Sequence, residues 1–400
     1  MRRFLREFFA IDHFIVVFYA LLLMWLVVAL AVNISFLNPL ERAVENFSMT
    51  DVFYDISNTS GERDTSDLIT LVDMTDVYDR SRLADIVDSI QKYEPALMGV
   101  DIVFEGWRGD TVGTERIIEA ICSASSPTVW AYKLADWNDE EEQFDGTVHS
   151  VFADLVDINE GYTNVIRDIN GGTVRSFGIT RKAEHRTQHS LPATVATTFL
   201  GDTTIYDRLT DQDINYTATV FPVLQPDSIW LHPELIRGRI VMLGATHDGQ
   251  DMHFTPIGKM AGLEVLAYTI QTMVEHRDVR LFTFWQTLLF TLLIIWLGQL
   301  CQHFTLKQFK RNHTHVGHFL YESEVTTAVI TFFILIILVG ICFWLFFTYN
   351  VYINTAWAMM GIALLLEARD LYKLTLILLY ERFHWAWLKR SVYADEIAKD

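Results

Sequence analysis

Long apolar segments alternate with long mixed segments along the chain. Residues 14–32, 281–300 and 326–347 contain no charged side chain. Each segment has roughly 20 residues, which is the length of α-helix that crosses the hydrocarbon core of a bilayer. A shorter apolar segment, 351–367, follows after only a few residues, as in a tight hairpin between antiparallel spans. The pattern predicts about four membrane spans, although a buried or interfacial helix also fits the last segment.

Lysine and arginine residues near these segments predict the orientation. They occur before the first segment, in the loop 301–325 and in the tail 369–400, but not in the loop 349–354. Such residues accumulate on the cytoplasmic side. With four spans these flanks share one side, so we expect both termini in the cytoplasm and residues 35–280 outside it. The first segment also has the small-residue ending of a signal peptide, but its length favours an uncleaved anchor.

The external segment carries an alternating pattern of strands and helices. After a polar linker, 38–64, short apolar runs predict buried strands at 68–72, 97–103, 128–132 and 239–243. Leu83, Ile86, Val87 and Ile90 share one face of a predicted helix. A second helix contains Ile117, Ile118 and Ile121, with Thr111 or Thr114 as its cap.

Two later helices are also predicted in this segment. Residues 190–200 fit a helix with Ser190 as its cap and Pro192 in its first turn. Residues 262–274 fit a helix that continues as a stiff link into the second span. Asn-Gly-Gly at 170–172 indicates a hairpin turn, and the calcium-loop alternative lacks the later ligands.

Together these elements predict the fold class and the domain organisation. Alternating strands and helices indicate an α/β domain with a mixed, largely parallel sheet covered by helices on both faces. We assign 1–34 to the N-terminal flank and first span, and 35–280 to the external domain. Residues 281–368 hold three more spans of an α-helical bundle, at 281–300, 326–347 and 351–367. Residues 369–400 form an amphipathic cytoplasmic tail.

Charge is concentrated in the external domain. The chain has a net charge of −19 at pH 7, and residues 35–280 hold 40 Asp and Glu against 19 Lys and Arg. Such a domain does not favour nucleic acid as a partner. Of three cysteines only Cys122 is external, so no intramolecular disulfide is expected there.

Three motifs resemble the type-2 CHASE domain, a bacterial extracellular sensor domain of histidine kinases, nucleotide cyclases and protein kinases. They are GVDIVFEG at 99–106, GYTN followed by DINGGTVR at 161–175, and RIVMLGAT…D…TPIG…AGLEVLAYTIQTM at 239–273. The resemblance implies a sensor domain followed by three spans. Two departures stand out: Asp76-Val77-Tyr78-Asp79-Arg80 replaces the usual basic-aromatic stretch, and we expect no kinase or cyclase domain after the last span.

Candidate ligand-binding residues lie after the predicted strands. Asp73 and Asp101 follow what we take to be neighbouring parallel strands, and Thr246 follows the strand 239–243. Open α/β sheets bind ligands at that edge, so a small polar or cationic ligand is one interpretation. Helix caps and turns are the other. Asp251, matched to the family's loop aspartate, and Arg175, from the second motif, complete the set.

Catalytic and metal sites receive no support from the motifs. The chain lacks a G-x-S-x-G elbow, a phosphate-binding Gly-Lys loop and an H-E-x-x-H helix, so we expect no enzyme activity and no cofactor. His247, Asp248, Asp251 and His253 could bind a metal, and so could His303, His313, His315 and His318. Solvated or turn-bonding side chains are the preferred interpretation of both groups, so we assign no metal site.

The sequence therefore favours a transmembrane, receptor-like sensor. Its periplasmic domain would detect an unidentified ligand or protein, and the bundle would pass that state to a separate partner through 301–325 and 369–400. The alternative is a structural subunit of a cell-envelope or secretion complex. We expect the protein to lie in the bacterial inner membrane. The sequence leaves open whether it forms homo-oligomers. A transporter or channel is disfavoured because the predicted spans carry almost no ionisable residues.

Overall fold

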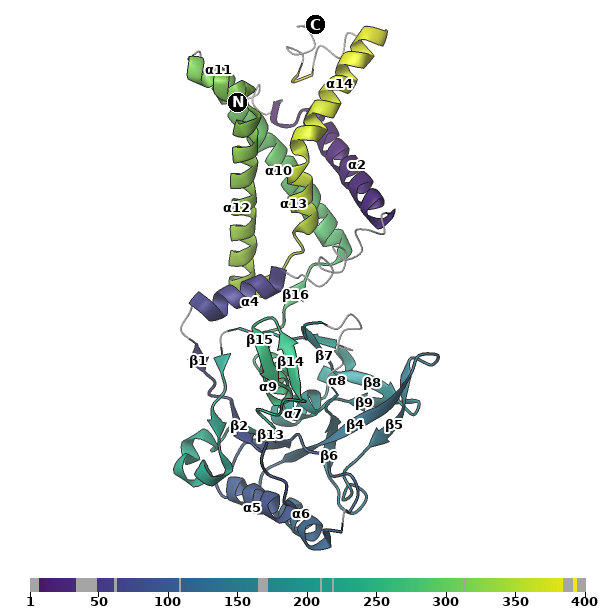
Figure 1. Ribbon diagram of the computed structural model, residues 1–400, viewed down its shortest axis with the longest axis vertical. Coiled ribbons are helices and arrows are strands. Elements are labelled where there is room, and N and C mark those ends of the chain that lie inside the picture. Colours follow the sequence, from purple (N-terminus) through teal and green to yellow (C-terminus); the bar gives the residue numbers. More distant parts are fainter. Residues whose placement is uncertain are drawn as a thin grey trace. The chain divides into compact units, whose positions relative to one another are not determined.

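A computed structural model describes residues 7–33, 49–60, 63–107, 109–164, 172–208, 211–217, 219–311, 314–383 and 391–393. The chain forms two compact units, one of residues 46–279 and one of residues 1–45 together with 280–400. We call them the α/β unit and the helical unit (Figure 1).

A nine-stranded sheet forms the centre of the α/β unit. Its strand order is β12-β2-β13-β3-β4-β5-β8-β9, and β6 also pairs with β4. The strands are β2 (Ile69–Asp73), β3 (Leu97–Val100), β4 (Thr128–Asn138), β5 (Gln143–Val148), β6 (Asn159–Tyr162), β8 (Thr180–Ala183), β9 (Arg186–His189), β12 (Val223–Leu224) and β13 (Ile240–Gly244). From β12 to β4 all pairings are parallel, and β4–β5 and β8–β9 are antiparallel.

The parallel strands are buried on both faces, as their continuous apolar sequences predict. Every residue of β2, β3 and β13 is buried. Helices α5 (Arg80–Gln91) and α6 (Thr111–Ser123) pack on one face around Val100 and Leu243. Helices α7 (Leu191–Leu200) and α9 (Gly262–Val274) contact the same strands. The predicted α/β class is confirmed, with the antiparallel part added by β5, β8 and β9.

Glycine at two strand positions permits the close approach of α7 and α9. A Cβ on Gly99 would lie 2.5 Å from the sulfur of Met242 and 3.4 Å from Val195 of α7. A Cβ on Gly244 would lie 2.9 Å from Leu263 of α9. These contacts place α7 and α9 on the face opposite α5 and α6, as Figure 1 also shows.

Most predicted helices of this unit are confirmed. Leu83, Ile86, Val87 and Ile90 are the buried apolar face of α5. Ser190 caps α7 by accepting a hydrogen bond from the Ala193 N–H at 3.3 Å. The cap of α6 was predicted wrongly, because Asp110, rather than a threonine, accepts from the Gly113 N–H at 2.8 Å.

Two expectations for the connecting segments are corrected. Within the supposed linker 38–64, residues Met49–Ser60 form helix α4, which buries Phe53 and Tyr54. Helix α9 ends at Val274, and residues 275–283 are not helical. No continuous helix therefore links α9 to α10, which begins at Phe284. The hairpin predicted at 170–172 lies mainly outside the described residues.

The remaining strands of the α/β unit are short. They are β1 (Asp64–Thr65), β7 (Ser176–Gly178), β10 (Asp211–Asp213), β11 (Thr219–Val220), β14 (Met252–Thr255) and β15 (Gly258–Ala261). Helix α8 spans Ile205–Arg208, and the 3-10 turns η2 and η3 span Pro226–Leu231 and Pro233–Leu235.

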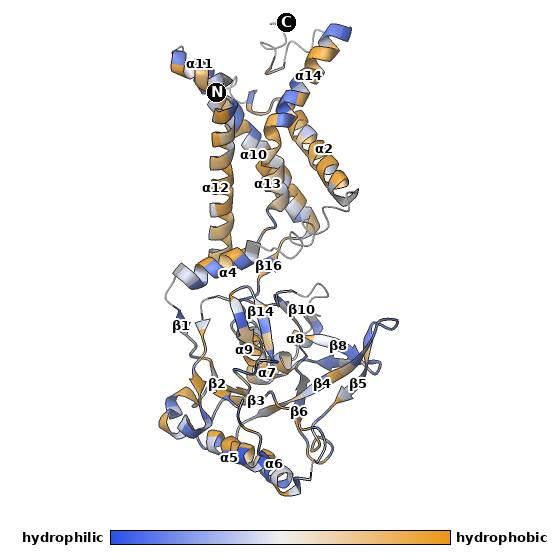
Figure 2. Cartoon of the chain, in the orientation of Figure 1, coloured by the Kyte–Doolittle hydropathy of each residue, from blue (hydrophilic) through white to orange (hydrophobic). Residues whose placement is uncertain are grey.

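The helical unit contains three described helices long and apolar enough to cross a membrane. They comprise α2 (Ile11–Asn33) over Ile11–Leu30, α10 (Phe284–Arg311) and α12 (Glu324–Tyr349). Figure 2 shows that these helices consist mainly of hydrophobic residues. Helix α11 (His315–Glu322) lies between α10 and α12, and β16 (Arg280–Leu281) pairs with β17 (Val351–Tyr352).

The fourth predicted span is not one continuous helix. Residues 351–367 contain β17, the short helix α13 (Ala356–Ala363) and the start of α14 (Leu365–Phe383). The charged Glu367, Arg369 and Asp370 lie within α14, which crosses the predicted start of the tail at residue 369. Helix α13 packs tightly on α10, where a Cβ on Gly361 would lie 2.2 Å from Ile295.

Candidate functional site

The carboxyl edge of the parallel sheet carries three of the five candidate residues, but it brings only two of them, Asp73 and Thr246, into contact. Asp73 is the last residue of β2, and Asp101 directly follows β3. The expectation that these strands are neighbours is wrong, because β13 pairs with both and lies between them. Strand neighbours lie about 4.8 Å apart, so the two backbones are separated by about twice that distance. Thr246 follows β13 and turns toward Asp73.

Hydrogen bonds surround the Asp73 carboxylate. Its Oδ1 accepts from the Thr75 hydroxyl at 2.7 Å, from the Thr75 N–H at 3.1 Å and from the Thr246 N–H at 3.4 Å. Its Oδ2 accepts from the Gln225 amide at 3.1 Å, and His247 Nδ1 lies 3.1 Å away. The side chain is only 3% exposed.

This environment favours the ionised form of Asp73. Burial alone would raise its pKa, but the hydrogen bonds from Thr75, Gln225 and Thr246 outweigh burial and lower the pKa to about 2. Asp73 is therefore a fixed negative charge at physiological pH. Its oxygens already accept hydrogen bonds from Thr75, Gln225 and Thr246, so the carboxylate holds the end of β2 to the residues that follow β13.

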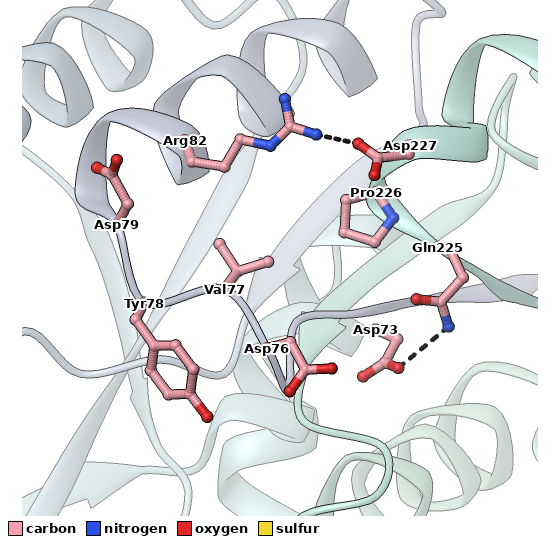
Figure 3. A pocket seen from close by; sticks show the side chains of 9 residues that line it. All are labelled: Asp73, Asp76, Val77, Tyr78, Asp79, Arg82, Gln225, Pro226 and Asp227. Atoms are coloured by element: carbon pink, nitrogen blue, oxygen red, sulfur yellow. Dashed lines mark hydrogen bonds and ion pairs between the residues drawn. The ribbon is translucent and has the colours of Figure 1, made fainter.

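A cavity of about 360 Å³ opens beside Asp73 (Figure 3). One wall is the segment from β2 to the start of α5, with Asp76, Val77, Tyr78, Asp79 and Arg82; the other is Gln225, Pro226 and Asp227. The lining has four carboxylates and one guanidinium group. The cavity therefore has a net negative charge.

The cavity's carboxylates differ in their existing contacts. Asp79 caps α5 by accepting from the Ser81 N–H at 2.8 Å, and Asp227 pairs with Arg82. Asp76 is exposed, and among the described residues it has no hydrogen-bond or ion-pair partner. Asp76 is thus the carboxylate most available to a bound cation.

A second group of side chains surrounds Asp101. Burial, followed by the nearby negative charge of Asp251, raises the pKa of Asp101 to about 7, against smaller opposing effects of Thr163 and Lys133. The Asp251 carboxylate lies over the start of α9, where a Cβ on Gly262 would be 2.5 Å from its Oδ2. Glycine at this position therefore leaves room for Asp251.

A family model for the CHASE2 domain matches residues 21–300. The chain belongs to the CHASE2 domain family. CHASE2 is a sensor-domain family, so the resemblance seen in the three motifs is confirmed. Neither the curated proteins nor the solved structures contain a significant match to the chain.

The histidine-containing loop of this CHASE2 domain divides between the two carboxylate groups. His247 contacts Asp73, whereas His253 Nε2 lies 3.1 Å from Asp251 Oδ1. No group of three or more histidine, cysteine or acidic residues with metal-binding geometry occurs among the described residues. In the other histidine group, His303 pairs with Glu7 at 3.1 Å, and His313 lies outside the described residues.

Arg175 is not part of either carboxylate group. Its guanidinium forms a two-bond ion pair with Asp51 of α4, at 2.9 and 2.6 Å. This contact holds α4 on the segment that precedes β7. Arg175 thus contacts α4 rather than the residues that line the cavity.

Residues 225–227 were missed by the sequence analysis. They reach the cavity because β12 pairs with β2 across about 150 positions of sequence. A signal existed on the opposite wall, where Asp76-Val77-Tyr78-Asp79-Arg80 departs from the usual family pattern. That departure coincides with the acidic lining of the cavity.

Proposed function

We propose that the protein is a transmembrane sensor whose CHASE2 domain binds an extracytoplasmic ligand and passes its state to a separate partner protein. The family match carries the proposal, since it covers the α/β unit and reaches the flanking helices α2 and α10. Three helices of the described part of the chain, each long and apolar enough to span a membrane, support it.

The α/β unit is proposed to lie in the periplasm of a bacterial cell, with both chain termini in the cytoplasm. The Lys and Arg flanks support this orientation. A variant that keeps only Cys122, which is exposed, should react with a membrane-impermeant maleimide in intact spheroplasts. A variant whose single cysteine is Thr314→Cys, between α10 and α11, should react only after permeabilisation. The reverse pattern would invert the proposed orientation.

A small cation is the ligand class that the cavity favours. Asp73 contributes a fixed charge, Asp76 has no partner among the described residues, and Tyr78 is 86% exposed at the rim. An aromatic face next to carboxylates suits an amine through cation–π attraction. We propose binding without turnover, because the lone pairs of Asp73 that a general base needs are occupied by fixed donors.

Calorimetric titration of the full chain in detergent tests the ligand. Methylamine, 1,4-diaminobutane and Mg²⁺ are suitable probes, and we expect binding of an amine that weakens at least about tenfold in Asp76→Asn. The matched control is Asp85→Asn. Asp85 lies on α5 outside the cavity, and the substitution removes its ion pair with Arg116. Equal affinities in wild type and Asp76→Asn would exclude cation binding in this cavity.

The signalling role needs a partner. Affinity purification from native membranes in mild detergent, followed by mass spectrometry, should recover a kinase, cyclase or regulatory protein in near-stoichiometric amount. Several stoichiometric envelope or secretion components without a signalling enzyme would instead support the structural-subunit alternative.

A further inference from the structure

Residues near the C-terminal end of the described chain return to the start of the first membrane helix. Ser391 Oγ donates to Asp12 Oδ1 at 2.5 Å, and the Val392 N–H donates to Asp12 Oδ2 at 3.3 Å. Tyr372 of α14 donates its hydroxyl to the same Oδ1 at 2.8 Å. Asp12 is 7% exposed. One carboxylate therefore joins α2, α14 and residues 391–392.

Tyr393 fills a site next to this carboxylate. Its side chain is 5% exposed, and its hydroxyl accepts from Gln299 Nε2 of α10 at 2.8 Å. Lys373 of α14 lies over its ring, 5.6 Å from the centroid. The backbone N–H of Tyr393 donates to Ser391 Oγ at 3.1 Å. The segment thus contacts the helices through a backbone N–H, the side-chain hydroxyl of Ser391 and the aromatic side chain of Tyr393.

We propose that α2, α10 and α14 form a docking site for the Ser-Val-Tyr segment at 391–393, with Asp12 as its anchor. The specificity follows from the chemistry. A carboxylate removed from water needs donors, and the Ser391 hydroxyl and Val392 amide supply two of them. Tyr393 adds buried aromatic area with a satisfied hydroxyl.

The position of the site in the chain gives it a regulatory use. Among the described residues, α2 and α10 are the membrane-length helices that precede and follow the α/β unit in sequence, and each contributes one polar group, Asp12 and Gln299, to the site. A shift of either helix along its axis would separate these groups and weaken docking. If the proposed sensor function holds, docking would control when the tail is available to a partner. The docking itself does not depend on that function.

Pulsed electron–electron resonance on the full chain tests the docking. One spin label is placed at Leu378→Cys, 64% exposed on α14, and another at Val392→Cys, whose contact with Asp12 is made by its backbone N–H. The three native cysteines are replaced by serine or alanine. We expect one narrow distance distribution in this background, because the docked segment fixes the second label relative to α14.

Three variants and one control decide the outcome. Asp12→Asn and Tyr393→Ala should lower the docked fraction by about tenfold or more relative to the released one, because each removes a buried polar contact. Ser391→Ala should have a smaller effect in the same direction and leaves the helices intact. Tyr19→Phe is the control: it removes a bond from α2 to Thr375 of α14, 3.0 Å long, that does not involve the tail.

Unchanged distributions in both Asp12→Asn and Ser391→Ala would overturn the proposal. Broadening in Tyr19→Phe equal to that in Asp12→Asn would also overturn it, because general loosening of the α2–α14 contact would then explain the result. The resonance measurement uses neither a ligand nor a partner. A negative result would therefore refute the docking without testing the proposed sensor function.

Discussion

Asp73 and Asp101 lie at the same edge of one sheet but have opposite electrostatic properties. The Asp73 carboxylate has donors from three residues, and its pKa is lowered to about 2. Asp101 lies where burial and the charge of Asp251 act together, and its pKa is raised to about 7. Burial opposes ionisation at both positions, so the hydrogen-bond donors at Asp73 and the charge of Asp251 near Asp101 decide the difference.

The two carboxylates therefore affect stability in opposite pH ranges. Asp73 has a lower pKa folded than unfolded, so it stabilises above about pH 4 and loses that contribution as the pH falls toward 2. Asp101 has a higher pKa folded than unfolded. Its contribution is retained below about pH 4 and is lost as the pH rises toward and past 7. Asp73 therefore stays ionised near neutral pH, whereas the protonation of Asp101 changes there.

The largest effect is expected for Asp73→Ala, which removes the carboxylate that accepts these hydrogen bonds. The backbone and side-chain donors of Thr75, Thr246 and Gln225 would lose their acceptor. We expect a loss of about 2–4 kcal/mol in the free energy of unfolding. Chemical denaturation of the full chain in detergent measures it. Asp76→Ala, in the same cavity, should change stability by less than about 0.5 kcal/mol.

Asp101→Asn should act in the opposite direction. The amide cannot ionise, so at pH 8 the variant should be more stable than wild type by about 1–3 kcal/mol, since each unit of pKa displacement corresponds to about 1.4 kcal/mol. At pH 4 the two proteins should be nearly equal. Unfolding midpoints measured across pH 4–8 check both values, and a variant less stable than wild type at pH 8 would contradict this account of Asp101.

Asp251→Asn tests the cause of the Asp101 shift. Removing the neighbouring charge should move the pKa of Asp101 toward its usual range, while burial keeps part of the displacement. We expect the stability lost between pH 4 and 8 to shrink by roughly 1 kcal/mol. A pH profile identical to that of wild type would show that burial alone raises the pKa.

The smallest effect is expected for Arg82→Ala. Arg82 and Asp227 form an ion pair at the rim, but their side chains are 49% and 86% exposed. Exposed pairs contribute about 0.2–1 kcal/mol, and this one should lie at the low end. Thermal unfolding in low and high salt measures the contribution. A loss comparable to that of Asp73→Ala would remove the distinction between buried and rim charges.

Local patterns predicted those elements that a few adjacent residues define. The apolar periodicity of α5, the Ser190 cap of α7 and the buried runs of β2 and β13 all required only neighbouring residues. The helix α4 was missed because Asp51, Asp55 and Asn58 give its sequence a polar, linker-like composition. It is held by burial of Phe53 and by contacts of Tyr54 with the distant Tyr216 and Ile214, which no local pattern contains.

The candidate site was predicted only in part. That Asp73, Asp101 and Thr246 follow strands was evident from the sequence, but the order of the strands was not. The insertion of β13 between β2 and β3 separates the two carboxylates and brings Thr246 to Asp73. Arg175 was grouped with them through its motif, yet it pairs with Asp51.

The sequence by itself determined the family, the segregation of apolar helices from an acidic α/β domain, and most strand and helix types. These depend on hydrophobic periodicity and on motifs, which are local properties. Tertiary structure decided which polar groups lie near each carboxylate: Gln225 near Asp73, Asp251 near Asp101, and Ser391 near Asp12. All three contacts join residues 150 to 379 positions apart in the sequence, and the balance between burial and hydrogen bonds at each carboxylate exists only once the chain is folded.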